Sequence, residues 1–384
     1  MTEHVHAPAP LGGQLLTPVT ALLGALSLAA AVVLVVRFIY GLGAVTNLSD
    51  GFPWGIWIAY DVVVGSALAC GGYTMAILVY IFNKGEYHPL VRPALLASLF
   101  GYTLAGASVI VDLGRYWNVW HMFWPGYSQV NSVMFEVAVC ITLYILVMWI
   151  EFSPAFLDKL GLSGARRKVS RLMFLFVALG VLLPSMHQAS LGGLLVIFGS
   201  QIHPLWQAGM AIPLEFLMSA VLMGFAVVIF EATLVAVGFK RQMETALLSK
   251  MAKFMWGLLI AFLVVRFADL ILRGAILEAL RFKLEAFWFW IETLCFCVPA
   301  VTLSSDDKRR NPGTLFAAAV LLMLAGFLLR INAFLVGYET GEGWSYFPAF
   351  AELVLTVGLI SFEILAYIVF VKKLPVLPKQ SATH

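Results

Sequence analysis

The sequence predicts an all-α polytopic membrane protein with about ten transmembrane helices. Hydrophobic residues make up 61% of the chain and charged residues only 12%, whereas soluble proteins average about a quarter charged. The mean hydropathy of +0.93 agrees with this class. Apolar runs of about 20 residues, the length that a helix needs to cross a bilayer, recur along the chain and exclude the alternating pattern of a membrane barrel.

Each predicted helix is one such apolar run, and all belong to a single integral membrane domain over residues 1–384. The first run begins at Thr17 and follows His4, His6 and prolines without any Lys or Arg, so it lacks the basic start of a cleaved signal peptide and should remain as a helix. The predicted spans are Thr17–Phe38, Trp54–Phe82, Arg92–Leu113, Asn131–Ile150, Leu172–Phe198, Pro213–Gly238, Phe254–Leu272, Ala286–Leu303, Gly313–Asn332 and Ala349–Val371.

Basic residues gather at one set of helix ends, called here the basic end. The loops at the opposite end contain only Arg273, Arg281 and Lys283. By the positive-inside rule both termini are predicted to be cytoplasmic, and the net charge of +3 then reflects topology, with no reason to invoke nucleic acid. The basic end carries Lys84, Arg92, Lys159, Arg166, Arg167, Lys168, Arg171, Lys240, Arg241, Lys250, Lys253, Lys308, Arg309, Arg310, Lys372, Lys373 and Lys379.

Ionisable residues inside the predicted helices cluster toward the opposite, non-cytoplasmic end. Each costs roughly 2.5–3.5 kcal/mol at mid-membrane on insertion scales and needs a partner, water or a ligand. Glu151, Glu231 and Glu363 fall in the cytoplasmic half instead. The asymmetry predicts a polar site near the non-cytoplasmic face, built from Asp61, Asp112, Arg115, Glu136, Glu215, Arg266, Asp269, Glu292, Arg330 and Glu352.

Spacing along the helices suggests which of these charges neutralise one another. Asp112 and Arg115 are three residues apart, as are Arg266 and Asp269, so each pair is expected to share a helix face. Each pair is either a structural salt bridge or an anchor for a polar headgroup. The glutamates without a basic residue on the same helix turn are expected to titrate more readily, and these are Glu136, Glu292 and Glu352.

A weak internal repeat accompanies these acids. Asp112 precedes Glu136 at nearly the separation at which Asp269 precedes Glu292 four helices later. We therefore expect two related four-helix bundles, over residues 54–198 and 213–332, with the first and last helices outside them.

Cysteine and histidine bear on the cofactors. The four cysteines lie inside predicted helices and form no metal-ligand motif, so we expect no metal site. A b-type haem in a membrane bundle usually needs deep histidine ligands, and only His187 is deep. The sequence thus predicts a subunit without haem, and a haem-binding cytochrome is the less favoured interpretation.

His187 follows Pro184 in a long helix with polar neighbours, and it is either a satisfied packing residue or a proton carrier, because imidazole titrates near neutral pH. Tyr102, near the middle of the third helix, lies at a depth between Glu136 and Glu231. We therefore predict a proton-transfer line of Glu136, Tyr102, His187 and Glu231.

Aromatic residues flank the acids. Trp54, Trp57 and Tyr60 precede Asp61, and Tyr116 and Trp117 follow Asp112 and Arg115. Such rings often form an interfacial aromatic belt. Flat rings beside hydrogen-bonding groups would also suit a quinone headgroup whose isoprenoid tail stays in lipid.

At these segments the chain resembles the NrfD, polysulfide-reductase-like family of membrane subunits, and within it the hydrogenase-2 branch. The segments are GFPWGIWIAYD, YHPLVRPALLASLFGY, DLGRYWN, NSVMFE, LLPSMHQASLGG and HPLWQ. The resemblance implies a haem-free, quinone-interacting subunit of a bacterial inner membrane. By the same resemblance it would exchange electrons between a periplasmic four-cluster ferredoxin-like iron-sulfur subunit and menaquinone, with [NiFe] hydrogenase small and large subunits beyond.

The resemblance also implies a quinone pocket in the first bundle. The matching polar positions are Asp61, Asp112, Arg115 and Glu136, with His187 and His203 nearby by topology. Asp61, Arg115 and His203 would hydrogen-bond or protonate the quinone, and Trp57 would lie beside it.

The sequence therefore predicts a non-autonomous subunit of a hydrogen:quinone oxidoreductase that carries no electron carrier of its own. Two alternatives remain open. A proton-coupled transporter or channel would also use buried acids and repeated bundles, although its site would lie near the membrane midplane. The partner of the subunit would otherwise be a different NrfD-type oxidoreductase.

Overall fold

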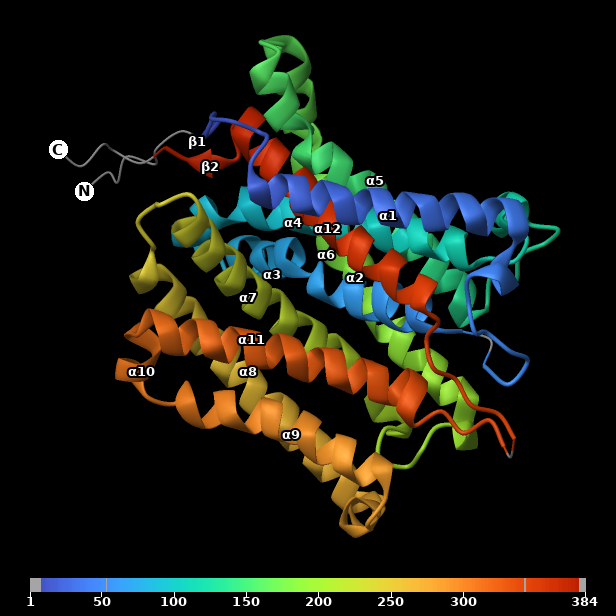
Figure 1. Cartoon of the computed structure of the whole chain (residues 1–384). Coiled ribbons are helices and arrows are strands. Elements are labelled where there is room, and N and C mark those ends of the chain that lie inside the picture. The colour runs from blue at the N-terminus through green and yellow to red at the C-terminus, as the bar shows by residue number, and fades with distance from the viewer. Residues whose placement is uncertain (1–7, 53, 342, 380–384) are drawn as a thin grey trace.

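Long helices, alternating in direction, run between two ends of the molecule in a computed structural model that describes residues 8–52, 54–341 and 343–379 (Figure 1). Ten helices among these residues are long and apolar enough to cross a membrane, which confirms the all-α polytopic class and each predicted span. The long α-helices are α1 Pro18–Tyr40, α4 His88–Asp112, α5 Val133–Lys159, α6 Ser163–Phe198, α7 Ile212–Gly238, α8 Thr245–Leu272, α9 Leu284–Thr302, α11 Pro312–Ile331 and α12 Phe350–Lys373.

The second span is assembled from several short pieces. The π-helical segment η2 (Trp57–Val64) leads into α2 (Gly65–Leu68), and α3 (Gly71–Ala76) leads into a second π-helical segment, η3 (Ile77–Ile81). Between α2 and α3, at Ala69 and Cys70, ψ rises to 7° and the α-helix is interrupted. The break is a feature that the continuous apolar run did not reveal.

Short elements connect the spans. At the basic end the five-residue helix α10 (Asp306–Arg310) lies between α9 and α11, and a third π-helical segment, η9 (Asn332–Val336), extends α11 at the opposite end. The remaining 3-10 turns are η1 Leu42–Ala44, η4 Gly85–Tyr87, η5 Tyr116–Phe123, η6 Gly199–Gln201, η7 Gly209–Ala211 and η8 Ala275–Leu280.

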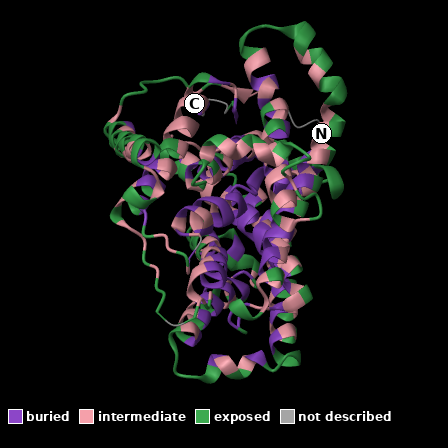
Figure 2. Ribbon diagram, turned by 90° about the vertical axis from the view of Figure 1, so that its right-hand side faces the viewer, coloured by how far each residue is buried: buried purple, intermediate pink, exposed green. Residues whose placement is uncertain are grey.

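Helices at the centre are buried, and helices at the edge turn apolar faces outward (Figure 2). In the most apolar stretch of Trp57–Ile81, 78% of residues are buried, against 11% in α1. Exposed Leu and Val side chains on α1 are what a lipid-facing helix requires. The broken second span is therefore the axis of the molecule.

The sequence suggested two groups of helices, the first made of the second span, α4, α5 and α6, and the second made of α7, α8, α9 and α11. Contacts occur within each group, but they also join the groups, because α6 and the second span pack on α7. α1 packs on α12. The two-bundle arrangement and its origin by duplication stay predictions.

The two terminal segments meet at the basic end. Strand β1 (Pro8–Ala9) pairs antiparallel with β2 (Leu377–Pro378). The Leu11 amide donates to the carbonyl of Val371 at 3.2 Å, so the segment before α1 is joined to the end of α12. His4 and His6 lie outside the described residues.

Candidate functional site

Asp61 is a buried carboxylate in the π-helical segment η2. Its side chain is 8% exposed, and the Thr356 hydroxyl of α12 donates to its Oδ2 at 3.2 Å. π-Helical turns are rare and often occur at functional sites. Asp61 lines a cavity between η2, α4, α7 and α12 and is therefore a predicted site residue that faces open space.

Trp57 lies one turn earlier on η2 but points into the protein core. It is 1% exposed, and its Nε1 donates to the carbonyl of Glu352 at 3.2 Å. It lines neither of the described pockets. This hydrogen bond holds η2 against α12 and so fixes the position of Asp61.

Asp112 and Arg115 do not form the ion pair expected from their spacing. α4 ends at Asp112, so Arg115 lies in the exposed segment that follows and not on the next helical turn. The buried Arg37 of α1 instead donates to the carbonyls of Val111 and Leu113, both at 2.5 Å, and satisfies the end of α4. One carboxylate oxygen of Asp112, Oδ1, is buried without a hydrogen-bond partner among the described residues.

Tyr102 and His187 lie together in the first group of helices. Their ring centroids are 5.7 Å apart, and both side chains are fully buried. The Gln188 amide donates to the Tyr102 hydroxyl at 3.3 Å, and Cys70 Sγ at the helix break lies 3.6 Å from the same hydroxyl. Half-buried Glu136 precedes Val137, whose backbone lies beside the His187 ring. Tyr102 and His187, two members of the predicted proton line, are thus neighbours.

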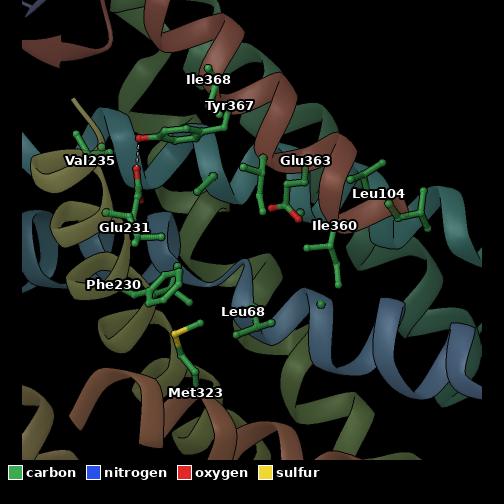
Figure 3. Close-up of a pocket in the computed structure, with 18 of the residues that line it drawn as sticks. Leu68, Leu104, Phe230, Glu231, Val235, Met323, Ile360, Glu363, Tyr367 and Ile368 are labelled. Carbon is green, nitrogen blue, oxygen red and sulfur yellow. Dashed lines mark hydrogen bonds between the residues drawn. The ribbon is translucent and has the colours of Figure 1, made fainter. Parts of the chain in front are cut away.

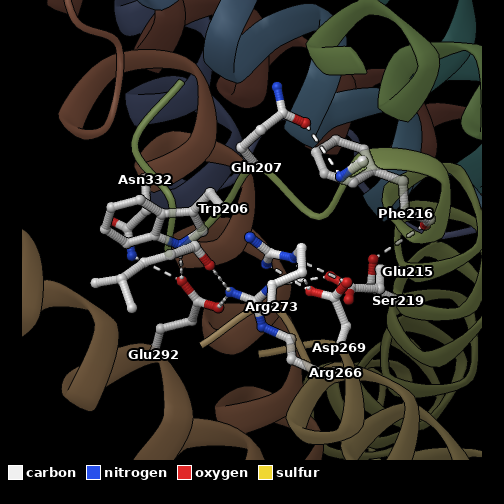
Figure 4. A network of polar contacts seen from close by, with 12 residues as sticks. Trp206, Gln207, Glu215, Phe216, Ser219, Arg266, Asp269, Arg273, Glu292 and Asn332 are labelled. Atoms are coloured by element: carbon white, nitrogen blue, oxygen red, sulfur yellow. Dashed lines mark hydrogen bonds and ion pairs between the residues drawn. The ribbon is translucent and has the colours of Figure 1, made fainter. Parts of the chain in front are cut away.

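A second polar network occupies the other group of helices (Figure 4). Arg266 of α8 donates to Glu215 of α7 at 2.8 Å and to Glu292 of α9 at 3.0 Å, and all three side chains are almost completely buried. The predicted Arg266–Asp269 pair is wrong, because Asp269 pairs with Arg273 one turn further along the helix. A buried charge needs both a counterion and hydrogen bonds, and partners on other helices supply them here.

Glu292, expected to titrate readily, is instead held by several donors. Besides Arg266, the indole of Trp206 donates to it at 2.8 Å and the amide of Asn332 at 2.9 Å. This network joins α9 and η9 to the loop before α7 and is structural in character.

Glu352 is likewise a structural acceptor. The backbone amides of Asn47 and Ala349 donate to it at 3.0 and 2.8 Å, and the Tyr346 hydroxyl at 2.6 Å. Burial, followed by the bond to Glu352, raises the pKa of Tyr346. These hydrogen bonds to Glu352 therefore hold the loop before α12 against the loop that contains Asn47.

His203 lies in the loop between α6 and α7. Its backbone amide donates to the Gly337 carbonyl at 2.7 Å, and its Nδ1 accepts from the Leu205 amide at 3.3 Å. Burial lowers the pKa of the imidazole. His203 lines neither described pocket, so the structure does not bring it to Asp61.

Arg330 is a fully buried cation whose hydrogen-bond partners among the described residues are all neutral. It donates to Ser219 Oγ, Gln188 Oε1 and the Phe216 carbonyl, each at 3.2 Å. Through Gln188 it is connected to Tyr102, so the two groups of helices share one buried hydrogen-bond network.

The cavity that Asp61 lines has a volume of about 600 Å³ and an apolar wall (Figure 3). Glu231 of α7 and Glu363 of α12 also line it, and the Tyr367 hydroxyl donates to Glu231. Glu231 therefore faces this cavity and is not grouped with Tyr102 and His187 as the sequence suggested. Glu363 was visible in the sequence as an acid of the basic half, but nothing there linked it to Glu231, because the two come from separate helices.

These features define a polytopic membrane protein with buried polar groups. The chain belongs to the family described as polysulphide reductase, NrfD, which matches residues 44–365. It is 44% identical over 97% of its length to 96% of the probable Ni/Fe-hydrogenase 2 b-type cytochrome subunit of Escherichia coli K12.

Two further relatives match at lower identity. The integral membrane subunit of menaquinone reductase from Nitratidesulfovibrio vulgaris is 28% identical over 89% of this chain and 87% of the relative. A selenate reductase subunit of Mesobacillus selenatarsenatis is 23% identical over 89% of this chain and 90% of the relative.

The expectation of a subunit without haem is corrected by the Escherichia coli relative, because the name b-type cytochrome implies haem. Histidine is the usual axial ligand of b-type haem. In the described part of the chain neither pocket has a histidine in its lining, and His187 packs against Tyr102. The residues present do not fit a haem at these places, and no step below passes through one.

Proposed function

We propose that the chain is the quinone-interacting membrane subunit of a [NiFe] hydrogenase-2 type complex in a bacterial inner membrane. The observation that carries the proposal is the 44% identity to the Escherichia coli hydrogenase-2 subunit along 97% of the chain. The menaquinone reductase relative supports menaquinone as the quinone. In this proposal the basic end and both termini are cytoplasmic, and the quinone binds toward the periplasm.

The proposed partners supply the electrons. A periplasmic four-cluster ferredoxin-like subunit would receive them from the small and large hydrogenase subunits, where hydrogen gives two protons and two electrons. The quinone takes two electrons and two protons to become the quinol. This chain would place the quinone near the partner cluster and control the protons.

Asp61 is the residue best suited to protonate the quinone. Its buried carboxylate lines the cavity, and its bond to Thr356 holds it in place. The apolar wall suits an isoprenoid tail. Trp57 would position η2. Asp112, Arg115 and His203 line neither described pocket, so no contact with the quinone is proposed for them. Glu136, Tyr102 and His187 would exchange protons beside the site.

The proposal is tested with the purified complex in detergent. The subunit should copurify with iron-sulfur and hydrogenase proteins, and hydrogen-dependent menaquinone reduction should be blocked by a quinone analogue. Reduction that is insensitive to the analogue, or a chain that purifies alone, would remove the proposal.

One observation favours a second candidate, a proton-coupled transporter. The second span is broken at Ala69 and Cys70, about midway between its ends, and broken helices form transporter sites. Uptake of a solute by vesicles that contain this chain alone, driven by a pH gradient, would support it.

A further inference from the structure

The cavity of Figure 3 opens sideways between α7 and α12, onto the surface that faces the membrane. α12 packs on α1, α4 and η2, whereas α7 packs on α6, α8, α11 and the pieces of the second span. The hydrogen bond from Tyr367 to Glu231 crosses the gap between the two helices. Leu234 of α7 and Ile364 of α12 line the cavity and are 49% and 45% exposed. Lipid therefore has access to the cavity from the side.

The part of the cavity in the basic half of the molecule matches one membrane leaflet in length. On α12 the lining runs from Leu359 to Lys372, which is about 20 Å at 1.5 Å per residue. Half of the hydrocarbon core of a bilayer is about 15 Å thick, and the headgroup region adds about 5–7 Å. The quinone headgroup is proposed at the other end of the cavity, beside Asp61. The basic half thus has the length that a second amphiphile needs.

The mouth of the cavity at the basic end is positively charged. Lys372 lines it, and its ammonium donates to the carbonyl of Gln14, which uses one of its three N–H groups. The first turn of α1 lines the same mouth through Thr17, Val19 and Thr20. The positive end of the dipole of this 23-residue helix lies there and adds to the charge of the lysine. An anionic headgroup is complementary to both.

The acids of the cavity lie deeper than this mouth and are engaged with its walls. Glu231 is about 10 Å along α7 from Gly238 and accepts the hydroxyl of Tyr367. Glu363 lies against α4, where its Oε1 is 3.2 Å from the position that a Cβ of Gly101 would occupy. These carboxylates therefore do not neutralise the charge at the mouth.

We propose that the basic half of the cavity binds an anionic glycerophospholipid from the leaflet on that side, with its phosphate at Lys372 and an acyl chain along the apolar wall. Basic pockets between transmembrane helices on the cytoplasmic side bind such headgroups. Burial of the chain adds affinity with each methylene group. The lipid fills the space between α7 and α12 and so completes their packing. The inference goes beyond the proposed function, because it requires neither hydrogen nor quinone turnover.

The test uses the full-length chain purified with its partners in a mild detergent and washed free of loosely held lipid. Native mass spectrometry then measures the binding of added phosphatidylglycerol and of added phosphatidylcholine. Phosphatidylglycerol should bind several-fold more tightly. A phosphatidylglycerol that carries a diazirine at the end of one acyl chain should crosslink, on illumination, to residues of α7 and α12 that line the cavity.

Charge and shape are tested by separate variants, each with a matched control. Lys372→Gln should weaken phosphatidylglycerol binding about fivefold, the usual contribution of one basic residue near an anionic lipid, and should leave phosphatidylcholine binding nearly unchanged. Lys373→Gln removes the neighbouring lysine, which does not line the cavity, and should bind as the wild type does. Leu234→Trp narrows the side opening without changing the charge and should abolish the crosslinks. Val237→Trp, at an exposed position of α7 outside the cavity, should keep them.

Thermal unfolding in detergent identifies the variants that are folded, and two variants keep the test decisive if one does not fold. Equal binding of the two lipids by the wild type overturns the inference, as do wild-type binding in folded Lys372→Gln and wild-type crosslinks in folded Leu234→Trp. Loss of the crosslinks when menaquinone is added would identify the whole cavity as a quinone tail site and would also overturn it. A complex that binds the lipid but reduces no quinone supports the inference and contradicts the proposed function alone.

Discussion

Arg266 is a cation on which three helices converge. Carboxylates from α7 and α9 lie on either side of it, and Trp206 and Asn332 use the remaining acceptor positions of Glu292. Charges buried to this degree are tolerated only when each has its partners. The members of the network therefore depend on one another, because the loss of one leaves the others buried in an apolar interior without a partner.

Replacement of Arg266 tests that view. Arg266→Gln should lower the free energy of unfolding by about 3–5 kcal/mol, because Glu215 and Glu292 are left as buried, unpaired acids. Arg273→Gln is the control, since its pair with Asp269 is partly exposed and worth at most about 1 kcal/mol. Thermal unfolding in detergent gives the comparison, and equal shifts for the two variants would contradict the account.

His203 should make stability depend on pH. Its pKa is lowered by burial, so the unfolded chain binds a proton more readily than the folded one. The stabilisation is complete above the unfolded pKa of about 6.5 and is lost as the pH falls below it. The charges of Glu285, Glu339 and Glu278 raise the pKa of His203 and the charge of Lys283 lowers it, but burial is the largest cause and the pKa is lowered overall.

The thermal midpoint should therefore fall between pH 7 and pH 5 by more in the wild type than in His203→Gln. His88→Gln, at an exposed position, should keep the wild-type slope. Identical slopes in all three proteins would show that His203 does not contribute.

At the scale of elements, the interrupted second span determines how closely its neighbours approach. α7 crosses it at Gly224, where a Cβ would lie 2.6 Å from the Cys70 carbonyl oxygen. The backbone of α7 can approach this part of the second span because position 224 has no side chain, and the Cys70 carbonyl there accepts from the Thr74 amide at 2.8 Å. The same interruption brings Cys70 to the Tyr102 hydroxyl.

Gly224→Ala should accordingly destabilise the protein by about 1–3 kcal/mol, the usual cost of overpacking. Gly257→Ala on α8 adds the same methyl group where nothing lies within 4 Å, and it should be neutral or slightly stabilising. Thermal midpoints measured side by side decide the matter. A tolerated alanine at position 224 would mean that the helices do not pack this closely.

The elements themselves were predictable from sequence, but their partners were not. Ten apolar runs are enough to place ten spans, because the bilayer fixes their length. The expected pairs Asp112–Arg115 and Arg266–Asp269 assumed helical neighbours. α4 ends too early for the first, and α7 and α9 supply the partners of Arg266. Glu363 joined the site only through the fold, because α12 packs on α4 and η2 and its Tyr367 donates to Glu231 of α7.

At the scale of the whole molecule, charge separates two ends. The basic loops lie at one end with strands β1 and β2, and the exposed aromatic segment η5 lies at the other. The proposed quinone site lies toward the end opposite the basic loops, so its function depends on which compartment that end faces. Orientation is therefore part of the mechanism.

Labelling tests the orientation. A cysteine introduced by Gln129→Cys, beyond η5, should react with an impermeant maleimide in spheroplasts, whereas Asp307→Cys on α10 should react only after lysis; both positions are exposed. The native cysteines lie within the membrane spans, so a cysteine-containing wild type serves as the background. The opposite labelling pattern would invert the proposed topology.

The most direct measurement of the central claim is quinone reduction by a complex that carries Asp61→Asn. With hydrogen as donor, menaquinone reduction should fall about 10²-fold or more, while reduction of a soluble dye by the hydrogenase stays unchanged. Asp50→Asn, an exposed acid at the same end, should behave as the wild type. Unaltered menaquinone reduction by Asp61→Asn would contradict the account.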